Sequence, residues 1–230
     1  MNSVWYDPRV RKQLIEYVNQ HVDVACVGFT DEKLDEERIR QLPCSTTIIT
    51  IDRRFLGHQK GVFRKVKREL LQCKAVQNAI IKEKPDVIHA NDLNALIPAY
   101  MARKKLGCRI VYDSHEINVE NFRSRNAFIL KRLLKTIESH MVRKVDAMIC
   151  VSHAAADYFA KTYKISPPMV ITNCTLKKEQ SPEKVSRDSQ YFELLNHGKY
   201  YAGRGYETMI RAAAELRDNP HIRFAVRGFG

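Results

Sequence analysis

The sequence predicts an α/β protein whose parallel sheet is covered by helices on both faces, followed by an incomplete second domain of the same kind. Three observations lead to this fold class. Short apolar runs of strand length alternate along the chain with longer segments of helical spacing. The segment 177–190, KKEQSPEKVSRDSQ, is polar and charged and has the composition of a linker. Beyond it the alternation resumes for one strand, one helix and one strand.

The first domain is expected to span residues 1–176 and to begin with a helix. In YDPRVRKQLIEYV, Asp7 directly precedes Pro8, an order typical of a capping residue and the first turn of a helix. Runs of apolar and β-branched residues, such as DVACVGF and TTIITI, predict strands. The strands of this domain are expected at residues 23–29, 46–51, 86–90, 108–113, 146–152 and 169–173.

Helices are expected between the later strands. Val62, Val66 and Leu70 recur at helical spacing and predict a helix over residues 62–84. The segment LIPAYMARKKLG is expected to be a helix that ends at Gly107. The remaining helices of the first domain are expected at residues 125–143 and 153–164.

The second domain is expected over residues 191–230. YFELLNHG predicts a strand, residues 206–217 a helix, and IRFAVRG a second strand. A single strand–helix–strand unit cannot bury both faces of a sheet. We therefore expect this domain to be truncated.

Composition excludes several classes of protein. The chain has 230 residues, of which 44% are hydrophobic, so it can support packed cores. No stretch approaches the ~20 apolar residues of a transmembrane helix, and the N-terminus lacks the pattern of a signal peptide. The six cysteines are scattered, form no Cys-x-x-Cys pair and do not cluster with histidine. These features predict a reducing, cytoplasmic location.

The net charge of +13 predicts attraction to phosphates. Between residues 53 and 74 there are eight cations against Glu69 alone. A second basic stretch contains Lys131, Arg132, Lys135, Arg143 and Lys144. Such stretches are either solvated helix faces or contacts with an anionic membrane at its inner face. Nucleic-acid binding is not expected, because interleaved aromatic residues and helix-turn-helix patterns are missing. The absence of G-x-G-x-x-G after the early strands argues against a dinucleotide-dependent dehydrogenase.

Four polar clusters fall where ligands bind in open parallel sheets, at the carboxyl ends of strands. They are YDPR (6–9), HANDLN (89–94), DSHE (113–116) and VSH (151–153). Each alone has a structural explanation, since a lone His is often structural and both Asp7 and Asp92 can cap helices. Their convergence on one edge favours a common cleft.

These residues resemble a known family. YDPRVRKQ, PDVIHANDLNALIPAYMARKKLGCRIVYDSHE, VDAMICVSHAAADYF and VITN, in this order and spacing, resemble the N-terminal domain of family 4 glycosyltransferases of the GT-B type. The tail, HGKYYAGRGYETMIRAAAEL followed by FAVRGFG, resembles the start of their C-terminal domain. The resemblance covers nearly the whole chain. In this family two Rossmann-like domains face each other across the active site.

The resemblance implies an acceptor-side Rossmann-like domain in residues 1–176 and the start of a nucleotide-sugar-binding domain in 191–230. It implies sugar transfer from a nucleotide-sugar donor to a glycan or lipid-linked acceptor, with retention of configuration. No metal and no cofactor are expected, because the nucleotide sugar is a co-substrate. The habit of the family and the basic charge suggest surface polysaccharide biosynthesis, with peripheral contact to an anionic membrane.

The resemblance also implies roles for single residues. His115 would be catalytic and would face the donor sugar. The acceptor-side residues would be Asp7, Arg9, His89 and Asp92. The donor-binding residues would be Gly198, Lys199, Arg204, Gly205, Gly228 and Gly230. Glu116 and Asn173 would be supporting residues.

Physical chemistry is consistent with these roles. The leaving nucleoside diphosphate gains charge as the glycosidic bond breaks, so Lys199 and Arg204 would stabilise the transition state. Glycines such as Gly205 permit close approach of the backbone to phosphate, although GRG can also be a plain turn before a helix. His115 would donate a hydrogen bond to a sugar hydroxyl or switch protonation near pH 7.

The chain departs from the family pattern at several points. Cys174 stands where the family usually has Gly after Asn, and Lys199 and Arg204 reverse the usual order of Arg and Lys. The acidic donor motif and the first strand with its Gly-rich turn are missing. The chain therefore resembles a fragment with little or no activity of its own. The alternative is an inactive half-enzyme that binds an acceptor, a membrane or a partner chain.

Overall fold

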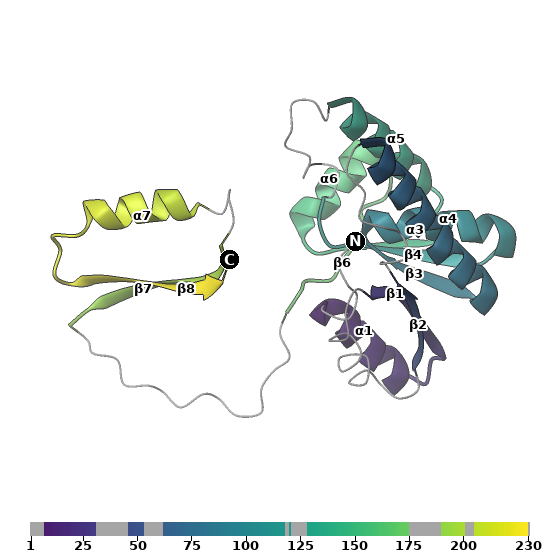
Figure 1. Cartoon of the computed structure of the whole chain (residues 1–230), viewed down its shortest axis with the longest axis horizontal. Helices are drawn as coiled ribbons and strands as arrows, with labels where there is room; N and C mark the ends of the chain where they lie inside the picture. The colour runs from purple at the N-terminus through teal and green to yellow at the C-terminus, as the bar shows by residue number, and fades with distance from the viewer. Residues whose placement is uncertain are drawn as a thin grey trace. The chain divides into compact units, whose positions relative to one another are not determined.

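The computed structural model describes residues 7–30, 46–52, 62–117, 120, 128–174, 190–200 and 205–229. The chain divides into two compact units, Met1–Thr175 and Leu176–Gly230 (Figure 1). Every strand pair in both units is parallel, which confirms the predicted α/β fold class. The expected linker, residues 177–190, lies outside the described residues except for Gln190. Among the described helices, none is both long enough and apolar enough to cross a membrane.

The first unit contains two parallel sheets. The strands are β1 (Val24–Thr30), β2 (Thr46–Asp52), β3 (Val87–Asn91), β4 (Arg109–Ser114), β5 (Ala147–Cys150) and β6 (Met169–Val170). Strands β1 and β2 pair with each other, and the larger sheet has the order β3-β4-β5-β6. The helices are α1 (Pro8–Asn19), α3 (Val62–Glu83), α4 (Asp92–Leu106), α5 (Phe128–Val142) and α6 (His153–Tyr163).

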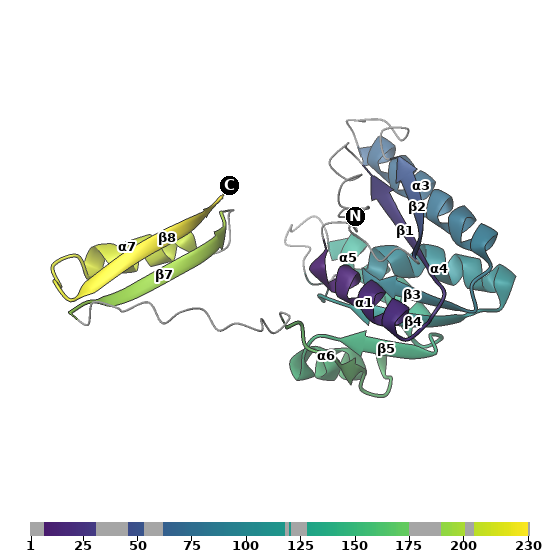
Figure 2. The ribbon, with the colours of Figure 1, turned by 90° about the horizontal axis from the view of Figure 1, so that it is seen from below.

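Helices lie on both sides of these strands, as the sequence predicted. Helices α3, α4, α5 and α6 lie on one side, and α1 crosses the other side (Figures 1 and 2). The main core joins the strands to the helix layer, and Leu96, Ile110 and Phe159 are completely buried in it. A smaller cluster, in which Val10 and Leu14 pack on Cys26, fixes α1 to β1. The neighbouring face of α1, which carries Gln13 and Tyr17, contacts the larger sheet.

Strand β5 and helix α4 differ from their expected bounds. Strand β5 ends at Cys150, since the hydroxyl of Ser152 accepts a hydrogen bond from the Ala155 amide and caps α6. Helix α4 begins at Asp92, earlier than the LIPAYMARKKLG segment indicated. It ends as expected at Gly107, whose φ of 73° is readily adopted only by glycine.

A buried carboxylate holds three elements of the helix layer together. Glu138 on α5 is fully buried. It accepts hydrogen bonds from the hydroxyls of Tyr112 on β4 (2.7 Å) and Tyr163 on α6 (2.6 Å). Burial raises the pKa of Glu138, although the two tyrosine hydroxyls oppose this shift.

We expect Tyr163→Phe to lower the free energy of unfolding by about 2 kcal/mol, because buried Glu138 loses one of its two donors. Urea denaturation measures the change. The matched control is Tyr158→Phe, which removes a hydroxyl that donates to the exposed carboxylate of Glu120. We expect the control to cost less than about 1 kcal/mol. Equal losses of unfolding free energy in the two variants would contradict the prediction that the hydrogen bond to buried Glu138 stabilises the fold more than the one to exposed Glu120.

The second unit is one strand–helix–strand arrangement, as expected. It consists of β7 (Phe192–Lys199), α7 (Tyr206–Glu215) and β8 (Ile222–Phe229). Helix α7 runs along one side of the two strands (Figure 2). Among the residues of this unit whose exposure the structure describes, none is buried, and Phe192 is 66% exposed. A single helix on a two-stranded sheet thus leaves most of its apolar surface accessible to solvent.

Candidate active site

A polar cluster lies at the carboxyl ends of β3 and β4, where the sequence predicted a cleft. Its centre is the carboxylate of Asp113, which is buried near the end of β4. The Oδ2 atom of Asp113 lies 3.4 Å from Nε2 of His89 and 3.3 Å from Nε2 of His115. One carboxylate oxygen therefore lies between two imidazole rings. His89 and His115 lie close together, as predicted. The residue that lies between them, Asp113, was not among the predicted site residues.

Asp92 links the start of α4 to the residue after β4. Its Oδ1 accepts a hydrogen bond from the His115 amide at 3.0 Å, and its Oδ2 lies 3.5 Å from Nδ1 of His115. Its φ of 65° is left-handed, which is costly for a residue other than glycine. The carboxylate of Asp92 therefore contacts His115, the residue that follows β4. Capping of its own helix by Asp92, the structural alternative, does not account for this contact.

Helix α1 places two further polar side chains over the cluster. Nε2 of Gln13 donates a hydrogen bond to Oδ2 of Asp113 at 2.6 Å. The hydroxyl of Tyr17 lies 2.5 Å from Nδ1 of His89. Arg9, Gln13 and Tyr17 are four residues apart and therefore share one face of the helix. This spacing is the sequence signal that could have identified Gln13 and Tyr17.

Asp7 and Arg9 form a pair at the start of α1. Asp7 caps the helix by accepting from the Arg9 amide at 2.9 Å, as predicted. Its two carboxylate oxygens also accept from Nε and Nη2 of Arg9, at 2.9 and 2.7 Å. The hydrogen bond to Asp7 raises the pKa of Arg9 against the effect of burial, and the charges of Asp92 and Glu116 add to this increase. Arg9 is therefore within electrostatic range of the cluster.

The surrounding carboxylates keep His115 protonated at neutral pH. Burial acts to lower the pKa of His115, but Asp113 and Asp92 outweigh it and raise this pKa to about 9. Burial likewise opposes ionisation of Asp113, but the two imidazoles hold its pKa well below its usual range. With this pKa a switch of His115 near pH 7 is not expected, and hydrogen-bond donation by the protonated ring is the alternative that we retain.

Several buried polar atoms of the cluster lack hydrogen bonds within the described part of the chain. These are Nε2 of His89, both ring nitrogens of His115 and Oδ1 of Asn91. The carboxylates near the rings are close enough for charge attraction but not placed for good hydrogen bonds. Buried polar atoms are rarely left unsatisfied without a functional reason. The cluster therefore keeps hydrogen-bonding capacity that the described residues do not satisfy.

The two expected supporting residues lie at the margins. Glu116 is exposed, and its carbonyl oxygen accepts from the Ser114 hydroxyl at 2.9 Å. Oδ1 of Asn173 accepts from Nζ of Lys12 at 3.2 Å, which connects α1 to the segment after β6. Within the described ranges, no group of three or more His, Cys, Asp or Glu residues is arranged to hold a metal ion.

The expected donor-binding residues lie in the second unit. Gly198 and Gly228 face each other in the β7–β8 register, and a Cβ on Gly228 would lie 1.9 Å from the Gly198 carbonyl oxygen. Gly205 has a φ of 76° and precedes α7, so its conformation also favours glycine. Lys199 ends β7, whereas Arg204 and Gly230 lie outside the described residues.

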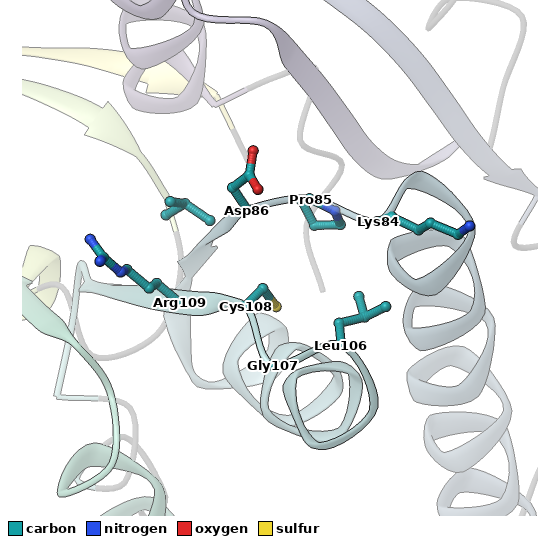
Figure 3. A pocket seen from close by; sticks show the side chains of 8 residues that line it. Lys84, Pro85, Asp86, Leu106, Gly107, Cys108 and Arg109 are labelled. Atoms are coloured by element: carbon teal, nitrogen blue, oxygen red, sulfur yellow. The ribbon is translucent and has the colours of Figure 1, made fainter.

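A shallow pocket of about 550 Å³ opens at the opposite edge of the larger sheet. It lies at the amino ends of β3 and β4, where Lys84, Asp86, Cys108 and Arg109 are among the residues that line it (Figure 3). None of the residues predicted to form the site lines this pocket. The pocket and the polar cluster are therefore separate features of the first unit.

The fold is that of GT-B proteins. The crystal structure of TarM superposes with a TM-score of 0.51 at 13% identity, over 69% of this chain and 31% of that chain. A putative UDP-N-acetylglucosamine 2-epimerase from Listeria monocytogenes gives 0.56 at 10% identity, over 94% and 56%. The lipopolysaccharide outer core galactosyltransferase WaaB gives 0.51 at 12% identity, over 87% and 56%. At these identities the likeness concerns the fold alone, and the chain spans between 31% and 56% of these proteins.

The sequence, unlike the fold, assigns the chain to a particular family. Residues 10–175 match the model of Glycosyltransferase Family 4, and the chain belongs to this family. The family predicted from the ordered motifs is thereby confirmed. A comparison with curated protein sequences gave no match.

Proposed function

We propose that this chain is the acceptor-side part, with the beginning of the donor side, of a glycosyltransferase that uses a nucleotide sugar. The observation that carries the proposal is the Asp113 carboxylate placed between His89 and His115 at the carboxyl ends of β3 and β4. This edge is where open parallel sheets bind ligands. Family membership supplies the reaction class.

In the proposed mechanism, the cationic ring of His115 donates a hydrogen bond to a hydroxyl of the donor sugar. Asp113 and Asp92 keep the ring protonated and hold its orientation, so its charge is in place before the glycosidic bond breaks. Lys199 and Arg204 would stabilise the nucleoside diphosphate that leaves. Asp7, Arg9 and His89 would bind hydroxyl groups of the acceptor.

The finer features belong to the same proposal and derive from the family resemblance. The sugar would be transferred with retention of configuration and without a required metal. The acceptor would be a glycan or a lipid-linked sugar in surface polysaccharide biosynthesis, on the cytoplasmic side of the membrane. The ring nitrogens of His89 and His115 that have no hydrogen-bond partner support a ligand with several hydroxyl groups.

One observation favours the alternative of a binding module without turnover. No residue of the second unit whose exposure the structure describes is buried, so this unit is a weak platform for rigid phosphate contacts by itself. The 230-residue chain would then bind an acceptor, while sugar transfer would need further donor-binding structure.

The test is release of nucleoside diphosphate from a panel of nucleotide sugars, with a membrane lipid extract as acceptor. We expect the full gene product that contains residues 1–230 to turn over in the presence of EDTA and to retain the anomeric configuration, as NMR of the product measures. We expect the isolated 230-residue chain to show little or no turnover. Efficient transfer by the isolated chain, or no consumption of any nucleotide sugar by the gene product, would contradict the proposal.

A further inference from the structure

Helix α1 places a tyrosine hydroxyl against one ring nitrogen of a site histidine. The hydroxyl of Tyr17 lies 2.5 Å from Nδ1 of His89, and the two rings meet edge to face with their centroids 6.0 Å apart. A neutral imidazole has one nitrogen that donates a hydrogen bond and one that accepts. The direction of the contact with Tyr17 therefore shows which nitrogen of His89 holds the proton.

The carboxylate of Asp113 determines this direction. Nε2 of His89 lies 3.4 Å from Oδ2 of Asp113. Burial opposes ionisation of Asp113, but the hydrogen bonds and charges of His115 and His89 hold its pKa well below its usual range. A lone pair on Nε2 of His89 would be repelled by the ionised carboxylate, whereas an N–H would be attracted. The neutral ring of His89 therefore holds its proton on Nε2, and Nδ1 accepts.

Tyr17 can supply the donor that Nδ1 of His89 requires. Burial raises the pKa of the Tyr17 hydroxyl, and the charge of Asp113 adds to this increase, so the hydroxyl keeps its proton at neutral pH. The helix that carries it is fixed, because Val10 and Leu14 pack on Cys26 of β1. The hydroxyl of Tyr17 therefore approaches the ring from a preorganised position.

The Nε2 proton of His89 has no hydrogen-bond partner among the described residues. The Nε2 atom is buried, and the contact with Asp113 is an attraction between charges and not a well-aligned hydrogen bond. Oδ2 of Asp113 already accepts a hydrogen bond from Nε2 of Gln13 at 2.6 Å. The N–H of His89 can therefore donate to an oxygen atom of a ligand at the carboxyl end of β3.

We propose that Tyr17 is a positioning residue, which donates to Nδ1 of His89, keeps the ring proton on Nε2 and directs this N–H to a hydroxyl oxygen of the acceptor. His89 would thus hold the acceptor as a hydrogen-bond donor in its neutral form. The role in acceptor binding rests on the proposed function, whereas the position of the proton does not.

The first experiment is ¹⁵N NMR of the imidazole groups in the 230-residue chain, at a pH where the His89 ring is neutral. The His89 signals are identified by their absence from His89→Gln. We expect a protonated Nε2 and an Nδ1 that accepts a hydrogen bond. Tyr17→Phe keeps the aromatic ring and should shift the Nδ1 signal to that of an acceptor without a donor. A proton on Nδ1 in the original chain, or an unchanged Nδ1 signal in Tyr17→Phe, would overturn the proposal.

The second experiment measures acceptor kinetics of the full gene product. Tyr17→Phe should raise the KM for the acceptor about fivefold and leave kcat within about twofold, because a hydrogen bond that orients a binding group is lost. Urea denaturation of the same variant separates binding from stability. A lower denaturation midpoint together with an unchanged KM would show that the Tyr17 hydroxyl only supports packing, and the proposal would be wrong.

The matched control is Tyr100→Phe. Tyr100 and His140 also meet edge to face, with centroids 6.1 Å apart, but the hydroxyl lies 3.4 Å from Nε2 of His140 and the pair is at the surface. The control should leave both the His89 signals and the acceptor KM unchanged, and an equal rise of KM in the two variants would contradict the proposal. The NMR result requires no sugar transfer, so this inference and the proposed function fail separately.

Discussion

Replacing His115 with alanine should reduce sugar transfer by the full gene product by about 10²- to 10³-fold, because a fixed cationic donor to the reacting sugar is lost. The ring is buried between Asp113 and Asp92, and its pKa of about 9 keeps it charged at neutral pH. The loss should fall mainly on kcat, since the hydrogen bond strengthens as charge develops. Initial rates at several donor concentrations measure this separation.

The control for this prediction is His140→Ala on α5, which removes an exposed imidazole that contacts Tyr100. Its activity should equal that of the unmodified protein. Circular dichroism of His115→Ala and of the more conservative His115→Gln distinguishes lost chemistry from lost structure. Near-normal kcat in a folded His115→Ala variant would remove His115 from the catalytic role.

The second large effect is expected for Asp113→Asn, which removes the charge shared by the two imidazoles. The pKa of His115 should fall by more than about one unit, because burial then acts against fewer opposing charges. The variant should also lose about 3 kcal/mol of stability at neutral pH, since a buried cation is left with one carboxylate in place of two. NMR titration of the imidazole signals and urea denaturation measure the two effects.

The same contacts determine how stability depends on pH. The pKa of His115 in the folded state is above its ordinary value of 6.5, so its contribution is complete below pH 6.5 and is lost as the pH rises through about 9. The pKa of Asp113 is depressed, so its contribution is present above its ordinary value of 3.8 and is lost as the pH falls. In Asp113→Asn the alkaline loss should shift to lower pH.

Asp146→Asn is the matched control for the second prediction. The carboxylate of Asp146 accepts from the Ile110 amide at 2.8 Å and pairs with Arg103, at the other end of β4. Its removal should leave the pKa of His115 unchanged. If the pKa of His115 is unchanged in Asp113→Asn as well, the Asp113 carboxylate does not determine the pKa of His115.

The fold followed from the sequence because local pattern and tertiary structure agree. The apolar runs before HANDLN and DSHE became β3 and β4, and the parallel arrangement then brought His89 and His115 to one edge. The partners supplied by α1 were not predicted, because they depend on how that helix crosses the sheet. The four-residue spacing of Gln13 and Tyr17 marks a shared helix face, but the sequence does not say what that face contacts.

The behaviour of single groups was harder to predict for the same reason. Capping rules suggested that Asp92 serves its own helix, but the His115 amide on a neighbouring connection is its partner. The ordinary pKa of histidine suggested a switch near pH 7, but the carboxylates of Asp92, distant in sequence, and of Asp113, two residues away, both lie near the ring and raise its pKa. In both cases the contact between Asp92 and His115, which are distant in sequence, contributes what the local preference does not include.

The close approach of β7 and β8 determines which substitutions can be interpreted in the second unit. Any side chain at Gly228 would collide with the backbone of Gly198, and its Cβ would also lie 2.9 Å from the ring of Tyr200. A Gly228→Ala variant would separate the strands, and its inactivity would carry no information about phosphate recognition. Lys199→Gln removes a charge without this collision, so it is the substitution that tests donor binding rather than chain folding.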